Sequence, residues 1–363
     1  MLITRVTADG FRNLKQADVY LSPGVNIIAG HNGQGKTNLI EAICVLASGR
    51  SWRTKNDREL ITFSEREAYV SVETLRGGVS DRIAAHIRAD EKKVISVNGY
   101  PVKRLGELLG VLLAVAFSPD DLALVKGGPA ERRRFMDVEL CQLSMPYYYE
   151  LKQYYHILRQ RNNLLKDLKK DGSLKDTVYV WDEIMARHGT AISGYRTAFL
   201  ERVNNAAGVI HGEISDKKER LQLVYKPNVG EKDFLPRLKK ALDRDIAAGV
   251  TSIGVHKDDI TFLLNGQDAK AYGSQGQQRL CCLSSKLALI TVIREEKHDD
   301  PVVLLDDVLS EFDSVRQKFL LRYIKDVQAV ITVTGAERVT DARARSAAMY
   351  EIDGGVIKQM LNY

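Results

Sequence analysis

The sequence lacks long hydrophobic runs: its 363 residues contain no uninterrupted apolar stretch of roughly eighteen residues, the length that a membrane-spanning helix requires. Residues 1–6 also lack the basic flank, the apolar block and the small-residue cleavage site of an export signal. Hydrophobic residues at 44% and charged residues at 28% are ordinary values for a soluble domain. These absences predict a soluble, cytoplasmic protein with no membrane partner.

Cysteine is scarce, and the cysteines show no Cys-x-x-Cys spacing. Each lies among apolar neighbours, as is typical of free thiols that pack in a core. We therefore assign no chemistry to Cys44, Cys141, Cys281 and Cys282. Internal repeats and low-complexity segments are absent as well.

Acidic residues are slightly outnumbered by basic ones, which gives a net charge of +6 and a pI near 8.9. An excess of this size permits a polyanionic partner such as nucleic acid but does not require one. The length of the chain predicts two lobes, each with its own apolar core.

The two ends of the chain show an alternation of strands and helices. Residues 25–29 form a short apolar strand that leads into a glycine-rich loop, and residues 36–47 follow as a helix that ends at Gly49. The turn dipeptide Asn98-Gly99 predicts a β-hairpin over residues 94–102. Farther on, the pattern predicts helices and apolar strands in alternation at 277–294, 302–305, 314–323 and 330–333.

Between these ends, residues 129–210 carry the spacing of helices. Two segments, through 151–165 and 181–199, are expected to pair as a short antiparallel arm, with the break between them at 171–173. A helix at 234–246 and a strand at 260–264 complete this region. We expect an α/β lobe from residues 1–117 and 250–363, and a helical lobe from residues 118–249.

The strongest motif is a phosphate-binding loop that fits G-x-x-x-x-G-K-[ST] between a strand and a helix. Its backbone N–H groups are expected to bind the phosphates of ATP, with Lys36 on the β- and γ-phosphates and Thr37 on Mg²⁺. An accidental glycine-rich turn is the alternative, and the strand-loop-helix context argues against it. The loop comprises Gly30, His31, Asn32, Gly33, Gln34, Gly35, Lys36 and Thr37.

Two acidic residues follow the apolar strand at 302–305, whose composition is typical of a strand that is buried on both faces. Because ligands bind at the carboxyl ends of parallel strands, Asp306 is expected beside the phosphate loop as a second Mg²⁺ ligand. Asp307 is expected to orient or deprotonate the attacking water, so that Asp307 and Lys36 are the candidate catalytic residues. The alternative is a strand that simply ends at solvated acids.

A third motif, Gly273-Ser274-Gln275-Gly276-Gln277, opens the helix that precedes this strand. Ser274, Gly276 and Gln277 are candidate nucleotide-binding residues because the N-terminus of a helix attracts anions. A plain helix cap by Ser274 is the alternative.

Together these motifs resemble the ATPase heads of SMC and ABC proteins and, more narrowly, the RecF family of bacterial DNA replication and repair proteins. The resemblance covers nearly the whole chain, and it implies an α/β, P-loop head with a helical insertion. The stretches that carry it are Phe11-Arg12-Asn13-Leu14, the phosphate loop, Gly49-Arg50-Ser51, 117–122, Val125-Lys126-Gly127, Arg132-Arg133-Arg134-Phe135, 274–279 and 306–311.

Two stretches depart from what the resemblance leads one to expect. The family's usual Gly-Pro-His-Arg-Asp-Asp reads Gly254-Val255-His256-Lys257-Asp258-Asp259 here, which leaves the local turn open. The ABC signature Leu-Ser-Gly-Gly-Gln reads Gly273-Ser274-Gln275-Gly276-Gln277 here, a form that is normal for RecF-like chains, which keep the Ser and the second Gly.

The resemblance implies a slow ATPase that works as an ATP-dependent homodimer. Each ATP would lie between the phosphate loop of one subunit and Ser274 and Gly276 of the other, and Asp313 would lie where the two sites communicate. The implied partners are single- and double-stranded DNA at gaps or junctions, RecR, and functionally RecO and RecA.

Candidate DNA contacts are the basic residues of the arm and two further clusters, with a solvated helix face as the alternative. Tyr147-Tyr148-Tyr149 and Tyr154-Tyr155 are interpreted as packing residues, and His188 as a core histidine. The candidate bases are Lys152, Arg159, Arg161, Lys166, Lys169, Lys170, Lys175, Lys103, Arg104, Arg132, Arg133 and Arg134.

Two other classes of protein share part of this pattern. The ATPase subunit of an ABC-type transporter has all three nucleotide motifs, but the basic helical insertion and the missing conventional glutamine loop argue against it. A small-molecule P-loop kinase is disfavoured by the Ser274 motif.

Overall fold

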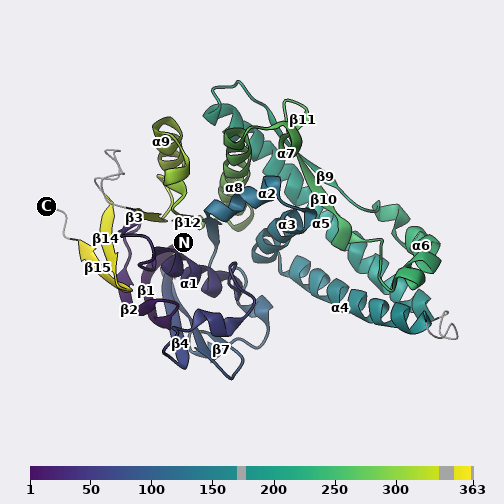
Figure 1. Cartoon of the computed structure of the whole chain (residues 1–363), viewed down its shortest axis with the longest axis horizontal. Coiled ribbons are helices and arrows are strands. Elements are labelled where there is room, and N and C mark those ends of the chain that lie inside the picture. Colours follow the sequence, from purple (N-terminus) through teal and green to yellow (C-terminus); the bar gives the residue numbers. More distant parts are fainter. Residues whose placement is uncertain (170–176, 335–346, 361–363) are drawn as a thin grey trace. The chain divides into compact units, whose positions relative to one another are not determined.

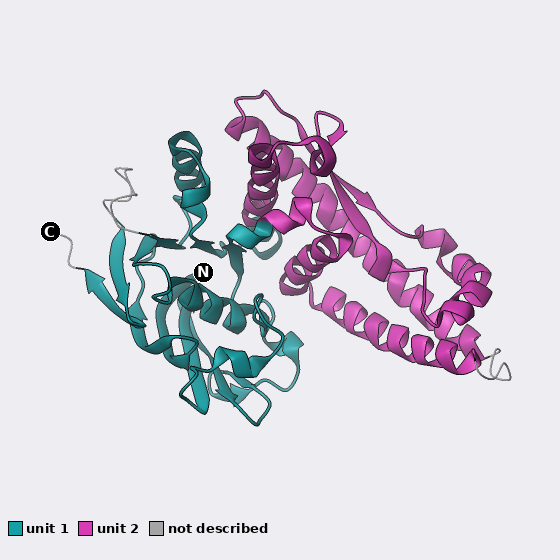
Figure 2. Ribbon diagram, in the orientation of Figure 1, with its two compact units in different colours: residues 1–121, 293–363 teal, residues 122–292 magenta. Residues whose placement is uncertain are grey.

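A computed structural model describes residues 1–169, 177–334 and 347–360 of the chain. The chain divides into two compact units (Figure 2): unit 1 comprises Met1–Asp121 and Ile293–Tyr363, and unit 2 comprises Leu122–Val292. The lobe boundaries predicted from the sequence, at 117/118 and 249/250, differ from these. Residues 250–292 group with unit 2 because β10 (Asp259–Leu264) pairs along its whole length with β9 (Leu221–Lys226).

Unit 1 is built on a large mixed sheet with the strand order β7-β6-β5-β4-β1-β2-β15-β14-β3-β13-β12-β8 (Figure 1). The strands from β14 to β8 in this order run parallel, and most of the remainder is antiparallel. The bounds are β1 Leu2–Phe11, β2 Leu14–Tyr20, β3 Val25–Ala29, β4 Glu67–Arg76, β5 Val79–Arg88, β6 Val94–Val97, β7 Tyr100–Pro101, β8 Ala114–Phe117, β12 Val302–Asp306, β13 Ala329–Val333, β14 Ala348–Asp353 and β15 Val356–Met360.

The helix α1 (Lys36–Ser48) fills the core of unit 1. Its apolar residues Leu39, Ile43 and Leu46 are fully buried and pack with side chains from both parts of the sheet. The helix ends at Gly49, whose φ of +73° is the left-handed conformation that glycine adopts without strain. The predicted strand, helix and Gly49 stop are confirmed, as are the hairpin at β6–β7 and the helix α9 (Ser314–Tyr323).

Unit 2 is mainly helical, with a small antiparallel sheet in the order β11-β10-β9. Its elements are α2 Ala123–Lys126, α3 Pro129–Leu143, α4 Met145–Leu168, α5 Val178–Ile214, α6 Phe234–Ala248, β11 Gln267–Asp268 and α7 Ala269–Tyr272. The helix α8 (Gln275–Lys297) begins in unit 2 and crosses the unit boundary.

The predicted antiparallel arm is confirmed by the pairing of α4 with α5. Glu150 pairs with His188, whereas Arg161, farther along α4, pairs with Asp182, nearer the start of α5. The predicted break at 171–173 lies outside the described residues. The stretch that begins at Gly254 forms a 3₁₀ turn, Val255–Lys257, despite its departure from the family pattern.

Several short strands of the structure have no clear local signal in the sequence. The sequence pattern does not reveal β8, β9, β14 or β15. Each becomes a strand by pairing with a segment that is distant in the sequence or, for β15, with β14 across a tight turn.

Candidate nucleotide site

The phosphate loop lies between β3 and α1. Close contacts with neighbouring atoms explain why two of its positions are glycine. A Cβ atom on Gly30 would lie 2.5 Å from the carbonyl oxygen of Ile352. At Gly35 the φ angle is +115°, and a Cβ atom would lie 2.6 Å from Asn13 Oδ1. The loop therefore needs glycine at both positions to pass between its neighbours.

Lys36 curls back over this loop. Its side chain is buried, and Nζ donates hydrogen bonds to the carbonyl oxygens of Gly30 at 2.6 Å and His31 at 2.8 Å. Burial lowers the pKa of Lys36, and the carboxylates of Asp307 and Asp306 oppose that shift. Hydrogen bonding within α1 begins with the N–H groups of Asn38 and Leu39, which both donate to the carbonyl oxygen of Gly35. The N–H groups of the residues before Asn38 precede this ladder, so they and the ammonium group together form a cradle suited to phosphate.

Asp306, at the carboxyl end of β12, is joined to α1 by a hydrogen bond from Thr37 Oγ1 to Asp306 Oδ1 of 2.9 Å. The strand order β3-β13-β12 brings the ends of β3 and β12 to the same edge of the sheet. Burial raises the pKa of Asp306, and the hydroxyls of Thr332 and Thr37 oppose this by donating to the carboxylate. Hydroxyl and carboxylate oxygens are ligands that Mg²⁺ prefers, so this pair fits the ion.

Asp307 is placed by an unusual backbone conformation. It has φ +52° and ψ +21°, the left-handed region that is uncommon for a residue with a side chain. Its N–H donates to Thr332 Oγ1 at 2.9 Å, and the Thr334 hydroxyl lies within 3.5 Å of its Oδ1. The same Thr334 hydroxyl lies 3.4 Å from Asn32 Oδ1, so Asp307 is near the phosphate loop.

The sequence analysis missed Thr332, which supports both acids. Its hydroxyl donates to Asp306 Oδ1 at 2.9 Å and accepts the N–H of Asp307. The available signal was a polar residue inside the otherwise apolar strand Ala329–Val333, where it is fully buried.

Glu41 on α1 was also missed, although it lies at the centre of an ion-pair cluster. Its fully buried carboxylate accepts hydrogen bonds from Arg12 at 2.8 Å, from Arg53 at 3.0 Å and from the hydroxyl of Ser51. Asn13, next to Arg12, donates to the carbonyl oxygen of Gly33 at 2.6 Å. The RecF-like stretches around Arg12 and Ser51 thus support the phosphate loop and its helix.

Ser274 lies in unit 2, at the start of α8. Its hydroxyl accepts the N–H of Gln277 at 3.3 Å, while Gln277 Oε1 accepts the N–H of Ser274 at 2.8 Å. This reciprocal pair is a capping box, so the helix-cap interpretation describes the local geometry. Ser274 and Gly276 are both exposed in unit 2, as a contact with another molecule requires. Asp313, predicted to lie at the interface, caps α9 through the N–H of Arg316.

The structure corrects two of the candidate DNA contacts. Arg132 is buried and pairs with Asp259, and Arg161 is fully buried and pairs with Asp182 and Asp245. Each guanidinium is compensated by carboxylates inside unit 2, so neither is available to a phosphate backbone. The candidates that are exposed are Lys103, Arg104, Arg134, Lys152, Arg159, Lys166 and Lys169, whereas Lys170 and Lys175 lie outside the described residues.

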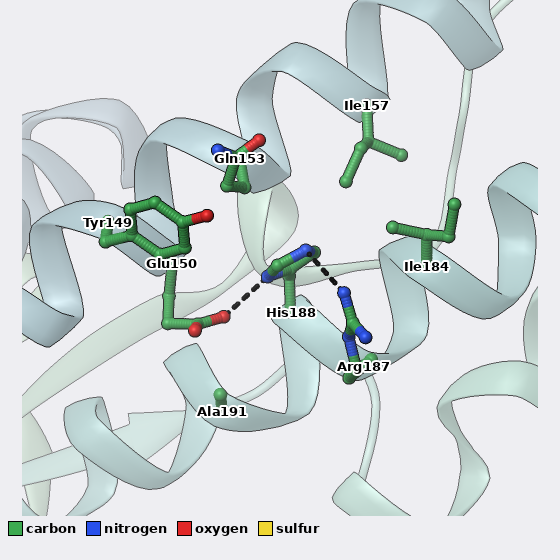
Figure 3. Close-up of a pocket in the computed structure, with 8 residues that line it drawn as sticks. All are labelled: Tyr149, Glu150, Gln153, Ile157, Ile184, Arg187, His188 and Ala191. Carbon is green, nitrogen blue, oxygen red and sulfur yellow. Dashed lines mark hydrogen bonds and ion pairs between the residues drawn. The ribbon is translucent and has the colours of Figure 1, made fainter.

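The aromatic residues of the arm mostly pack, as predicted: Tyr147 and Tyr154 are fully buried, whereas Tyr149 is exposed. A hollow of about 420 Å³ lies between α4 and α5 (Figure 3). His188 lies in its wall and is buried, which confirms the interpretation as a core histidine, and its Nδ1 lies 2.6 Å from Glu150 Oε2. The lining residues are Tyr149, Glu150, Gln153, Ile157, Ile184, Arg187, His188 and Ala191.

Among the described residues, no helix has the length and apolar character of a membrane span.

Comparison with known families places nearly the whole chain in one group. Residues 2–358 match the family described as RecF/RecN/SMC N terminal domain. The chain is 42% identical to the DNA replication and repair protein RecF of Lachnoclostridium phytofermentans, covering 99% of this chain and 100% of the relative. It is 40% identical to the protein of the same name from Lachnospira eligens, over 99% and 100% of the two chains.

Solved structures give the same result at the level of the fold. A structure of the recombination mediator protein RecF with ATP, in the RecFOR pathway, superposes with a TM-score of 0.92 at 34% identity, covering 99% of this chain and 97% of that chain. An Smc head bound to the C-winged helix domain of ScpA superposes with a TM-score of 0.59 at 17% identity, covering 99% and 97%, which shows a shared fold alone.

Proposed function

Because this chain belongs to the RecF family of DNA replication and repair proteins, we propose that it is an ATP-driven dimeric clamp that binds DNA during recombinational repair. The observation that carries the proposal is the hydrogen bond of 2.9 Å between Thr37 and Asp306, beside the buried Lys36. This contact joins two motifs that lie 269 residues apart into one potential nucleotide site. Family membership removes the transporter alternative.

ATP would bind with its phosphates in the loop from Gly30 to Thr37. The N–H groups at the start of α1 and the ammonium group of Lys36 would hold the β- and γ-phosphates. The relative solved as RecF-ATP supports this choice of nucleotide. Thr37 and Asp306 would hold Mg²⁺, which would neutralise phosphate charge when bound.

Hydrolysis would give ADP and phosphate by attack of water on the γ-phosphorus, with cleavage of the bond to the β–γ bridging oxygen. Asp307 would orient this water and accept its proton, because its left-handed backbone and its hydrogen bond to Thr332 fix the carboxylate beside the loop. Lys36 would stabilise the negative charge that develops on the bridging oxygen. A slow reaction of this kind would time the release of the dimer.

The second half of each site would come from another copy of the chain. The exposed Ser274 and Gly276, with Gln277 behind them, stand at the positive N-terminal end of α8, which suits them to the γ-phosphate held by the partner copy. An arrangement in which each copy supplies both halves is isologous and closes as a C₂ dimer. ATP would then stabilise the dimer by mass action.

DNA would bind to exposed basic side chains of unit 2. The main ones are Lys152, Arg159, Lys166 and Lys169, on α4 and at its end. Contacts of this type reach phosphates and do not read bases, which suits a gapped or junction duplex of any sequence. RecR would be the direct protein partner, and RecO and RecA the functional ones, in the cytoplasm. The support is the RecF relative that was solved as a member of the RecFOR pathway.

A complementation experiment tests the composite site. Lys36→Ala removes the cradle and Ser274→Arg blocks the helix tip, so each variant alone should lose ATP-driven dimerisation in light scattering. A mixture should regain dimers and part of the hydrolysis, because one of its two sites combines an intact Lys36 with an intact Ser274. Assembly with a gapped duplex is recorded in the same samples. A mixture as inactive as its components contradicts the proposal.

A further inference from the structure

The signature serine is connected to the interior of unit 2 by a continuous chain of side-chain hydrogen bonds. Ser274 and Gln277 cap each other, and Gln277 Nε2 donates to Glu219 Oε1 at 2.7 Å. The other carboxylate oxygen, Glu219 Oε2, lies 3.2 Å from His211 Nε2. On the far side of the ring, His211 Nδ1 lies 3.2 Å from Ser284 Oγ. The chain thus begins and ends on α8 and passes through the end of α5.

The Glu219 carboxylate sets the direction of these hydrogen bonds, because a carboxylate only accepts. His211 and Ser284 are fully buried, and burial lowers the pKa of His211 although Glu219 and a hydrogen bond to the backbone of Leu280 oppose the shift. A neutral ring has a single N–H, which Nε2 donates to the carboxylate, while Nδ1 accepts from the hydroxyl of Ser284. Glu219 is thereby held from behind, and its second oxygen is left to accept the amide of Gln277.

The carboxylate decides how the side-chain amide of Gln277 is oriented. An amide has a donor end and an acceptor end, and a carboxylate oxygen accepts only from the donor end. The Gln277 oxygen must then face the N–H of Ser274, where the structure places it at 2.8 Å. A charge-assisted bond to Glu219 therefore holds the capping box in one arrangement.

From this geometry we infer that Glu219 and His211 are positioning residues for the tip of α8, acting through Gln277 to fix Ser274 for the nucleotide of a second copy. The inference rests on the proposed function, in which Ser274 acts across a dimer. Neither residue touches the nucleotide. Their role is to keep the exposed serine from changing its orientation, and small displacements of a group that binds a transition state lower the rate strongly.

The test compares two substitutions of one residue. Glu219→Ala should lower kcat and the ATP-driven association of dimers by about tenfold or more, because the Gln277 amide is released. It should leave the ATP affinity of the dilute monomer unchanged, since the phosphate loop lies in unit 1. Glu219→Gln should restore both quantities: its oxygen still accepts from Gln277, and its NH₂ can donate to His211 when the ring adopts its other tautomer.

Two further comparisons separate positioning from stability. Glu213→Ala removes an exposed carboxylate from the same end of α5 and should match the wild type. Gln277→Ala combined with Glu219→Ala should be no worse than Gln277→Ala alone, because the two residues act as one unit. If Glu219 and Gln277 only stabilised the fold, each substitution would lower the midpoint of thermal unfolding. The two losses would then add in the double variant.

The outcomes distinguish this inference from the proposed function. Wild-type kcat and dimerisation in Glu219→Ala, or no recovery in Glu219→Gln, overturns the positioning role. If Ser274→Arg is impaired while Glu219→Ala is not, only the present inference fails. If Ser274→Arg itself keeps wild-type dimerisation, the proposed composite site fails as well.

Discussion

The hydroxyl of Thr332 donates to Asp306 Oδ1 at 2.9 Å and, at the same distance, accepts the backbone N–H of Asp307. One side chain therefore fixes both the proposed metal ligand and the proposed water-orienting residue. The hydroxyl lies on β13, between β3 and β12 in the sheet, so the order of the strands makes this double contact possible.

Thr332→Val keeps the shape of the side chain but removes both hydrogen bonds. We expect kcat to fall about tenfold while ATP affinity changes little, because the cradle around Lys36 does not use this hydroxyl. The lost hydrogen bonds should also cost about 1–3 kcal/mol of stability. Steady-state hydrolysis and nucleotide titration check this, and an unchanged kcat contradicts the assignment.

Lys36→Ala and Asp307→Asn should separate binding from hydrolysis. Without the ammonium group, ATP should no longer induce dimers, because the β- and γ-phosphates lose their cationic partner. Asp307→Asn leaves the cradle intact and should prolong the dimer, since ATP is bound but not hydrolysed. Sedimentation with ATP measures both; a dimer that forms equally well in Lys36→Ala argues against the scheme.

Binding to DNA should depend on the exposed basic side chains of α4 and not on the buried Arg161. Arg159→Gln should weaken binding to a gapped duplex and reduce the slope of log K against log salt by roughly one, as expected for one lost phosphate contact. Fluorescence anisotropy at several salt concentrations gives the slope. Affinity that does not respond to salt would remove phosphate contact as the basis of binding.

Arg161, two residues farther along α4, should instead affect stability. Its guanidinium donates to Asp182 at 2.6 Å and to Asp245 and Thr251 at 2.9 Å, with Arg161 and both carboxylates fully buried. Arg161→Met leaves two buried carboxylates without a counter-ion and should cost about 3–5 kcal/mol. Urea unfolding of this variant beside Arg159→Met provides the measurement, and equal stabilities contradict it.

His256 should make the protein less stable in weak acid. Burial lowers its pKa to about 4, opposed by a hydrogen bond to the carbonyl oxygen of Thr251 and assisted by the charge of Lys257. Because the folded pKa lies below the unfolded value of about 6.5, the unfolded chain binds the proton first, so stability is full above pH 6.5 and falls toward pH 4. The loss from this residue is about 3 kcal/mol.

His256→Gln should flatten this part of the stability profile, since glutamine does not titrate. The comparison of urea unfolding at several pH values between 7 and 4 isolates the contribution of His256 from those of other groups. An identical slope in the two proteins means that His256 is not the group responsible.

Local sequence was sufficient for the elements whose cause is local. The strand Val25–Ala29, the loop and the helix to Gly49 follow from apolar spacing and from glycines with defined backbone requirements. The same holds for the turn Asn98-Gly99 and for the capping box that starts at Ser274, since each involves residues within a few positions of one another.

Contacts between residues that are distant in the sequence depend on how the strands and helices pack. Thr332 and Glu219 gave no motif, because their roles come from strand order and helix packing that bring partners 26 and 58 residues away into contact. The sequence predicts Arg161 as an exposed DNA contact. In the structure it is buried and pairs with Asp182 of α5 and Asp245 of α6. The loop that can bind a phosphate follows from residues that are neighbours in the chain, whereas packing determines which side chains support it.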